Sequence, residues 1–463
     1  MLRVLWRSVV FAIIVILVMG SVGVYGYVQS QNQFWGAVRQ TPVPILDGVK
    51  KPRHDVNKPT IAVLLGNEIT EGLDFTIPYQ IFSMTGSYNV YAVAADKQVR
   101  SLSGGVDVVP HYSFEELDQL LGKSADIIVI PYMTVGNTDK YDHILNWIRK
   151  HKDTNLLSIC SGADTLAATG LLNGKTGATH WQTMPVLTRK YPDVKWVEDQ
   201  RYVTNDGGKI ISSAGISSGI DATLYVISQK FGAPLAEKIA KELNYPSIQF
   251  VKNPKVDPFF MDFRFTTYVF NNMFQWSKQN IGVMLYGGIE EMAVASVFDI
   301  YSDTGTSRVF PVSYADEPVT TKHGLNLLAR HTISNPPKVD KMIVPGTLAH
   351  SQAAKEINAW TEKGNGTKPQ LVHSDNRERF IFEVQLEDLA KQEDILTAKH
   401  AVKRLEFRAN DFQLQGKAFS VETYGAMLLT LIIALGIAIF VDRKWMVKRC
   451  TKRNGTTKAA RAA

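Results

Sequence analysis

Four short apolar runs separated by helix-like stretches constrain the fold of this chain most strongly. They cover residues 61–65, 90–94, 127–130 and 156–159. Short apolar runs without alternation are typical of strands buried on both faces, and the longer segments between them are typical of crossover helices. The pattern predicts an α/β fold around a mostly parallel sheet.

The last of these runs passes directly into a cysteine and then into a helical pattern. Cys160 follows the run, Ser161 and Gly162 open an alanine-rich stretch, and Gly170 is a typical residue for its end. We predict that Cys160 lies in a tight turn between strand and helix. There the positive end of the helix favours the thiolate, which is the form that attacks electrophiles. The alternative is a buried small hydrophobic residue, as most free cysteines are.

Several motifs around this turn carry a resemblance to a known family. They are Cys160-Ser161-Gly162-Ala163, Leu166-Ala167, Gly170-Leu171-Leu172, Thr179-His180-Trp181, Ser213-Ala214-Gly215-Ile216 and Gly219-Ile220-Asp221. Together they resemble the ThiJ/PfpI branch of the class I glutamine amidotransferase-like superfamily, and within it isonitrile hydratase and the ligand domain of some AraC-type regulators. The resemblance extends over about residues 60–250 and implies a flavodoxin-like sheet flanked by helices.

The resemblance also implies an acidic partner for the cysteine. Family members carry an acid followed, after three residues, by proline and then by an aromatic or aliphatic residue, and Asp74, Pro78 and Phe82 match this spacing. In isonitrile hydratases this acid and the hydroxyl residue after the cysteine are both implicated, which assigns roles to Asp74 and Ser161. A carboxyl close to a thiolate has a raised pKa and could hold a proton near neutral pH. Without the resemblance, Asp74 would be interpreted as a solvated loop acid.

His180 is a further candidate acid–base group, because the histidine of this family motif lies near the cysteine. A structural histidine beside Trp181 is an equally good interpretation. We expect no cofactor and no metal ion.

One departure from the family pattern affects the expected chemistry. Active relatives carry Pro-Gly-Gly after the third core strand, where glycine N–H groups help to form an oxyanion hole, whereas this chain has Pro131-Tyr132-Met133. Either the pocket is reshaped for a different substrate, or the site no longer turns over a substrate.

The second part of the chain repeats the first part incompletely. The parallel segments are 280–301 with 60–82, 309–333 with 90–114, 341–346 with 126–131, and 382–407 with 220–245. The repeat has no cysteine, and the position of Asp74 falls on Ala293 or Val294. We predict a truncated, non-catalytic domain over residues 280–412 that lacks the cysteine turn. Its expected use is folding, ligand binding or pairing with the first domain, and a homodimer is also possible.

Long uncharged segments lie at both ends. Residues 424–441 would span roughly 27 Å as a helix, enough for the hydrocarbon core of a membrane. We predict transmembrane helices over residues 8–28 and 424–441. The alternatives are a signal peptide cleaved after Gly23 and a buried soluble helix, respectively. Basic residues flank both outer ends, which predicts a two-pass cell-membrane protein with both termini in the cytoplasm and the domains outside.

The net charge of +7 comes largely from residues 442–463, where eight basic residues accompany one acid. Anionic lipid headgroups are the expected partner, and no nucleic-acid partner is needed. In this topology Cys160 and Cys450 lie on opposite sides of the membrane and cannot pair within one chain. Cys450 is either unmodified or lipidated.

Two linkers complete the chain. Residues 41–59 contain four prolines and are predicted to form an extended spacer. Residues 251–279 are too rich in aromatic residues for a solvated tether. They are expected to pack against the domains or across a dimer, with contact at the membrane surface as the alternative.

Three functional classes fit the sequence. The first is a cysteine-dependent hydratase or hydrolase acting on a small electrophilic molecule. The second is a catalytically silent ligand-binding or sensing module of the same fold, and the third is an inert scaffold.

Overall fold

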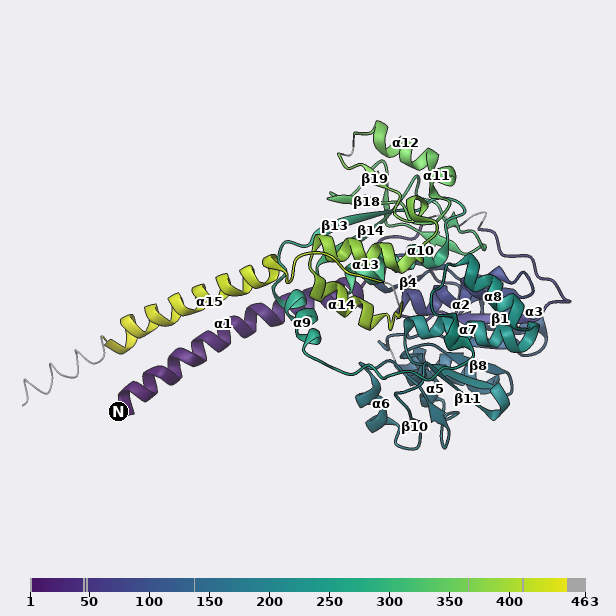
Figure 1. Ribbon diagram of the computed structural model, residues 1–463, viewed down its shortest axis with the longest axis horizontal. Coiled ribbons are helices and arrows are strands. Elements are labelled where there is room, and N and C mark those ends of the chain that lie inside the picture. The colour runs from purple at the N-terminus through teal and green to yellow at the C-terminus, as the bar shows by residue number, and fades with distance from the viewer. Residues whose placement is uncertain are drawn as a thin grey trace, which may run out of the picture.

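The computed structural model describes residues 2–44, 46, 49–136, 138–364, 366–409 and 412–447. Most of the basic tail, including Cys450, lies outside the described residues. Two long helices leave one side of an α/β body (Figure 1). We call residues 60–250 the first half and residues 280–409 the second half.

The first half is built around a seven-stranded sheet with the order β11-β12-β8-β7-β1-β3-β6, in which only the β11–β12 pair is antiparallel. Its strands are β1 Thr60–Leu64, β3 Asn89–Ala94, β6 Tyr112–Ser113, β7 Ile127–Ile130, β8 Asn155–Ser158, β11 Tyr202–Asn205 and β12 Ile210–Ser213. Ile61 and Val63 belong to one apolar cluster, and Ala62 and Leu64 belong to another. Successive side chains of a strand point to opposite faces, so the sheet is buried on both sides. The predicted flavodoxin-like α/β fold is confirmed.

Helices and short strands connect the strands of this sheet. The helices are α2 Gly72–Met84, α3 Phe114–Leu121, α4 Thr138–Lys150, α5 Gly162–Ala168, α6 Met184–Lys190, α7 Ile216–Phe231 and α8 Ala233–Glu242, with short helices η1 Ser103–Gly105, η2 Asp206–Gly208 and η3 Ile248–Val251. A separate pair of strands is formed by β9 Thr176–Gly177 and β10 Lys195–Trp196.

The second half contains a parallel five-stranded sheet with the order β17-β14-β13-β18-β19. Its strands are β13 Gln279–Met284, β14 Ser307–Ser313, β17 His331–Thr332, β18 Lys341–Ile343 and β19 Pro369–Gln370. Its helices are α10 Glu291–Val297, η4 Phe298–Ser302, α11 Ala349–Gln352, α12 Ala354–Glu362, η5 Ser374–Asn376, α13 Ile381–Gln392 and α14 Ile395–Arg404. The strand order and directions match those of β6-β3-β1-β7-β8 in the first sheet.

Matching hydrogen bonds fix how the two sheets correspond. Asp126 exchanges two bonds with Thr60, because its N–H donates to the Thr60 carbonyl and its carboxylate accepts from the Thr60 N–H, both at 2.8 Å. Asp340 makes the same pair of bonds with Asn280 at the same distances. Asp126 therefore corresponds to Asp340, and Pro131 to Pro345. The sequence alignment of 341–346 with 126–131 is wrong by one residue, because two apolar runs of equal length can be slid past each other without losing their pattern.

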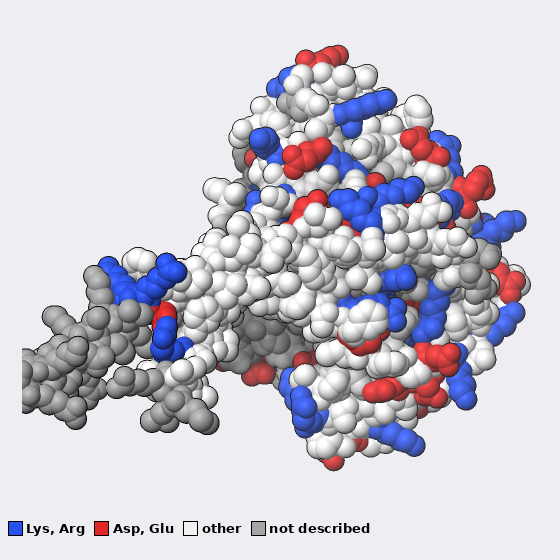
Figure 2. Space-filling view, turned by 60° about the vertical axis from the view of Figure 1, so that its left-hand side comes forward, with Lys and Arg blue, Asp and Glu red and all other residues white. Residues whose placement is uncertain are grey.

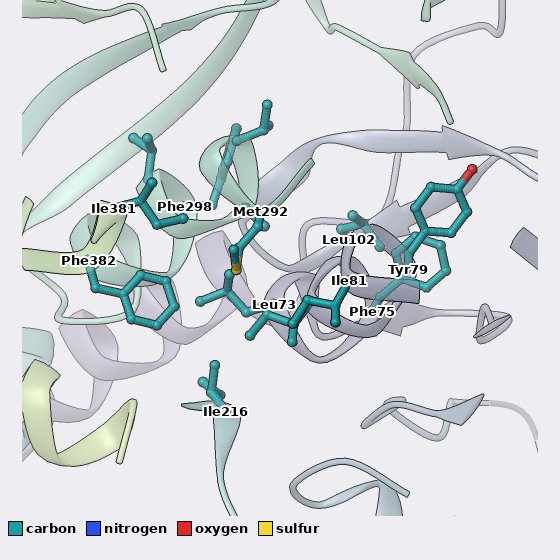
Figure 3. Packing of buried hydrophobic residues seen from close by; sticks show 14 of the residues in the cluster. Leu73, Phe75, Tyr79, Ile81, Leu102, Ile216, Met292, Phe298, Ile381 and Phe382 are labelled. Atoms are coloured by element: carbon teal, nitrogen blue, oxygen red, sulfur yellow. The ribbon is translucent and has the colours of Figure 1, made fainter. Parts of the chain in front are cut away.

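Strands from both halves form one small sheet with the order β15-β16-β5-β4-β2. The first half gives β2 Ile69–Thr70, β4 Arg100–Leu102 and β5 Asp107–Val109, and the second half gives β15 Val319–Thr320 and β16 Asn326–Leu328. β5 and β16 pair antiparallel, with Val108 opposite Leu327. Helices α2 and α10 also pack together, and Met292 points toward Leu73 between them (Figure 3). One apolar cluster includes residues of both halves.

The two long helices are α1 Leu2–Phe34 and α15 Val421–Val441, which continues into η6 Asp442–Val447. They lie side by side with their outer ends together, where Arg7 and Asp442 form an ion pair at 2.5 Å (Figure 1). Both are long and apolar enough to span a membrane. Helix α1 extends beyond the predicted segment 8–28 at both ends.

Helix α9 Arg264–Phe274 lies within the predicted linker 251–279 and packs against both long helices. Its approach to α1 is close, since a Cβ atom at Gly26 would lie 2.1 Å from the Met273 carbonyl oxygen. Glycine at this position therefore permits the contact.

Candidate functional site

Cys160 forms the turn between β8 and α5. Its φ is 56°, in the left-handed region that side chains other than glycine rarely adopt. Gly162 permits the turn, because a Cβ atom there would lie 2.1 Å from the Ile130 carbonyl oxygen at the end of β7. Such local strain is typical of functional sites, where the surrounding structure maintains it.

Three connected hydroxyl groups lie next to the cysteine. The Cys160 Sγ atom lies 3.9 Å from the Ser161 Oγ atom, and Ser161 is hydrogen-bonded to Thr183 at 2.9 Å. The Thr179 hydroxyl donates to the Cys160 carbonyl at 3.2 Å. Ser161 therefore lies where it can orient a small polar molecule beside the sulfur atom.

Asp74 lies in the first turn of α2 and is completely buried. Its N–H donates to the Glu71 carboxylate at 2.5 Å, and its Oδ2 atom accepts from the Tyr132 N–H at 3.3 Å. Within the described part of the chain, its Oδ1 atom has no hydrogen-bond partner. Burial, followed by the nearby charge of Glu71, raises the pKa of Asp74 well above its usual range, while the Tyr132 N–H, Arg404 and the neighbouring Cys160 thiol lower it less. Asp74 is therefore poised to carry a proton beside Cys160.

The Cys160 thiol is also buried, with 6% of its surface exposed. Burial raises its pKa well above the ordinary value, and the charges of Asp74 and Glu71 raise it further. This direction contradicts the expectation of a stabilised thiolate. Helix α5 has only seven residues, and its N-terminal end does not outweigh desolvation and the neighbouring carboxyl groups.

Arg404, at the end of α14, brings the second half into this site. Its guanidinium contacts Glu71 and Asp299 at 3.3 Å each and Asp303 at 2.8 Å, and all four side chains are buried. Burial raises the pKa of Asp303 to about 6 and the pKa of Asp299 well above its usual range. One buried cation thus serves three carboxyl groups, and such a cluster is costly to disturb.

His180 contacts the second half rather than the cysteine. Its Nε2 atom is 2.9 Å from the Arg404 carbonyl oxygen, and burial lowers its pKa to about 3. The neighbouring Trp181 indole donates to the Lys403 carbonyl at 3.1 Å. These contacts favour the structural interpretation of His180, in which a neutral imidazole donates to a carbonyl oxygen.

The inner end of α1 lies over the same site. The Arg404 guanidinium is 5.4 Å from the centre of the Phe34 ring, and the Trp35 and Tyr132 rings meet edge to face at 5.3 Å. The Tyr132 N–H, at the position where the family pattern has glycine, is occupied by Asp74. In this arrangement it is not free to bind a developing oxyanion.

The second sheet has its own residue at the position of the cysteine. Leu156 lies opposite Ile128 in the first sheet, and Pro369 lies opposite Met342, the counterpart of Ile128, in the second. Leu156 therefore corresponds to Pro369. Cys160 lies four residues after Leu156, and His373 lies four residues after Pro369, so these two residues correspond as well. The prediction that the second half lacks a cysteine turn needs this refinement, because the position is present but continues into the three-residue η5 rather than α5.

Sequence reasoning missed Glu71, Asp299, Asp303 and Arg404. Glu71 had a weak signal, since an acid three residues before another acid at a helix start is typical of a helix cap. For Arg404 there was none, because it reaches Glu71 across 333 positions of sequence.

No group of three or more His, Cys, Asp or Glu residues that could hold a metal ion occurs among the described residues.

Comparisons with known proteins match the first half of the chain to one family. The DJ-1/PfpI family model matches residues 59–229. The isonitrile hydratase of Pseudomonas putida is 28% identical over 176 residues, which cover 37% of this chain and 73% of that protein. Protein DJ-1alpha of Drosophila melanogaster is 26% identical over 178 residues, which cover 37% of this chain and 78% of that protein.

Solved structures of the same kind also match. A DJ-1 superfamily protein from Salmonella typhimurium is 21% identical, with a TM-score of 0.34, and the match covers 41% of this chain and 99% of that chain. An AraC family transcriptional regulator from Pseudomonas putida is 17% identical, with a TM-score of 0.34, and the match covers 39% of this chain and 97% of that chain. By its sequence matches, the first half of this chain contains a DJ-1/PfpI family domain.

Proposed function

We propose that this protein is a membrane-anchored, cysteine-dependent hydratase or hydrolase that acts on a small electrophilic molecule. The observation that carries the proposal is the strained Cys160 beside a buried Asp74 whose second oxygen atom has no partner in the described structure. The similarity to isonitrile hydratase supports water addition as the reaction type.

The proposed reaction has two steps and needs no redox partner. The Cys160 sulfur atom bonds to the electrophilic carbon of the substrate while the thiol proton passes, through Asp74, to the basic atom of the substrate. Water held near Ser161 then attacks the same carbon, Asp74 accepts a proton from it, and the carbon–sulfur bond breaks as the sulfur regains a proton. The net change is the addition of one water molecule.

The second half serves this site as a truncated relative of the first half. Its counterpart of Cys160 is His373 and its counterpart of Asp74 is Ala293 or Val294, so it cannot perform the same chemistry. Arg404 instead anchors Glu71, which caps the helix that carries Asp74. We propose domains at residues 60–250 and 280–412 that pair within one chain.

Both termini are proposed to lie in the cytoplasm. Helices α1 and α15 are antiparallel neighbours whose outer ends meet, and basic residues follow α15. The accessibility of Cys450 to a membrane-impermeant thiol reagent tests the topology. Labelling in inside-out vesicles but not in intact cells is expected, and the reverse pattern would contradict it.

Turnover tests the enzyme proposal directly. The full chain in lipid nanodiscs is incubated with a small isonitrile or a reactive carbonyl compound, and the hydrated product and any Cys160 adduct are measured by mass spectrometry. Activity should vanish in Cys160→Ser and fall strongly in Asp74→Asn. Glu242→Gln, an exposed change on α8, is the control. Activity that survives Cys160→Ser would overturn the proposal.

A ligand-sensing module is the second candidate, and the contact between α1 and the site favours it. Phe34 and Trp35 connect the membrane-side helix to Arg404 and Tyr132. A ligand that displaces Tyr132 would therefore move the end of α1. Saturable ligand binding that persists in Cys160→Ser, without turnover in the unmodified chain, would favour sensing over catalysis.

A further inference from the structure

The aromatic segment 254–263 is fixed to the body at both ends. At its start, the Arg201 N–H donates to the Pro254 carbonyl at 2.8 Å, and the Val256 N–H donates to the Asp199 carbonyl at 2.9 Å. Further along, the Arg408 guanidinium donates to the Asp257 carbonyl at 2.5 Å and lies 4.2 Å from the centre of the Phe259 ring. The segment is therefore a held loop and not a loose tether.

Lys403 completes this attachment. It donates to the Phe260 carbonyl, pairs with Asp262 at 3.1 Å, and lies 4.5 Å from the centre of the Trp181 ring. The backbone of the loop is thus held by residues of both halves.

Despite this anchoring, the tip of the loop exposes large apolar side chains. Phe260, Met261 and Phe263 are 66%, 54% and 70% exposed. Three neighbouring exposed apolar residues on a held loop are unusual for a soluble surface and are typical of a binding surface. We call these three residues the apolar tip.

The apolar tip is continuous with the membrane-side helices. It leads directly into α9, which packs against α1 and α15 on the side of the body from which both helices leave (Figure 1). Around the base of the helices, Tyr25, Trp276 and Phe419 are also exposed. Aromatic residues of this kind favour the boundary between lipid and water. Charged side chains are sparse where the helices join the body (Figure 2).

Basic side chains accompany the apolar tip. Arg264, Lys399, Lys403 and Arg408 line one groove of about 650 Å³ together with aromatic and aliphatic residues. Lys399 is exposed, and Arg264 has 40% of its side chain exposed although it pairs with Asp262. The combination of exposed aromatic and basic residues fits an anionic lipid surface.

Resting on the membrane anchoring proposed above, we propose that the apolar tip inserts into the headgroup region of the membrane that α1 and α15 would cross, with Arg264, Lys399 and Arg408 facing anionic lipid headgroups. The occupant of this surface is lipid. The body then rests on the bilayer at a third point besides the two helices.

Site-directed spin labelling of the full chain tests this proposal. Cys160→Ser and Cys450→Ser remove the native thiols, and Met261→Cys carries the nitroxide label. Val56→Cys is the matched control, because Val56 is exposed and precedes β1, which lies away from the two helices (Figure 1). Nanodiscs that contain one chain each and anionic phosphatidylglycerol are compared with discs of neutral phosphatidylcholine.

In anionic discs, the label at position 261 should collide several-fold less with a water-soluble nickel chelate than the label at position 56, and more with oxygen. The protection should be weaker in neutral discs. Equal nickel accessibility at both positions would overturn the proposal. Protection that appears only in discs with two chains would also overturn it, because the occupant would then be a second copy of the protein.

Discussion

The chain turns at the end of β8 through Cys160 with φ at 56°, whereas at the end of β19 it turns through His373 with φ at −92°. The two positions correspond in sheets of the same strand order. His373 accepts from the Gly346 N–H at 2.9 Å, and its Nε2 atom lies 2.7 Å from the Gln385 side-chain amide, so both of its ring nitrogen atoms contact groups of the second half. The cysteine turn instead combines backbone strain with buried carboxyl groups. The first turn thus has the strain and buried carboxyl groups on which the proposed chemistry depends, whereas the second turn has neither a positive φ nor a thiol.

The largest effect is expected at Arg404. Arg404→Met leaves Glu71, Asp299 and Asp303 buried without their cation and should cost about 3–5 kcal/mol near neutral pH. The loss should shrink at pH 5, where Asp303, whose pKa is about 6, is largely protonated. Thermal unfolding of the full chain in nanodiscs measures it. Glu242→Met, at the corresponding exposed position of the first half, is the control, and an equal effect of both changes would contradict the role of Arg404.

Gly162 and its counterpart Asp375 offer the next comparison. Gly162→Ala places a Cβ atom against the Ile130 carbonyl and should destabilise by about 1–3 kcal/mol. Asp375 is exposed, and Asp375→Ala should change stability by less than about 0.5 kcal/mol. The thermal unfolding midpoints of both variants are compared with the unmodified chain. Similar unfolding midpoints for the two variants would show that both turns tolerate alanine equally well, which would contradict the close approach at Gly162.

The turn at His373 and the acidic cluster around Arg404 should respond to pH with opposite sign. The pKa of His373 is lowered by burial to about 4, against about 6.5 in the unfolded chain. Between these values only the unfolded chain binds the proton, so His373 makes the free energy of unfolding fall by about 1.4 kcal/mol per unit of acidification.

Asp303 acts in the other direction. Its pKa is about 6 in the folded chain and about 3.9 when unfolded, so the folded chain alone holds the proton between these values. Acidification from pH 6 to pH 4 therefore raises the free energy of unfolding through Asp303. Denaturant unfolding at several pH values measures both contributions. In His373→Gln the free energy of unfolding should fall less on acidification than in the unmodified chain, and in Asp303→Asn it should lose the rise that Asp303 contributes. Changes of the same sign would refute the assignment.

The smallest effect is expected at Tyr132, the counterpart of Gly346. Tyr132→Gly removes a ring that packs against Trp35 beside the site and should raise the alkylation rate of Cys160 a few-fold. Trp35→Ala should act in the same direction. An unchanged alkylation rate in both variants would show that these rings do not limit access to the thiol.

The parallel sheet and the cysteine turn could be predicted because both depend on local patterns, namely short apolar runs and a glycine after Cys160. The register of β18 could not, since sliding 341–346 by one residue preserves its apolar character. The acidic surroundings of Cys160 depend on Glu71 and on Arg404, which meet only in the folded chain. For this reason the sequence favoured a thiolate, whereas the folded site favours a thiol.

The pH dependence of Cys160 alkylation tests the central claim most directly. It is measured in the full chain with Cys450→Ser, with and without Asp74→Asn. The Cys160–Asp74 pair predicts a midpoint above the ordinary cysteine value of about 8.5 that falls when Asp74 is neutralised. A midpoint below that value, or one that Asp74→Asn does not move, would contradict the pair.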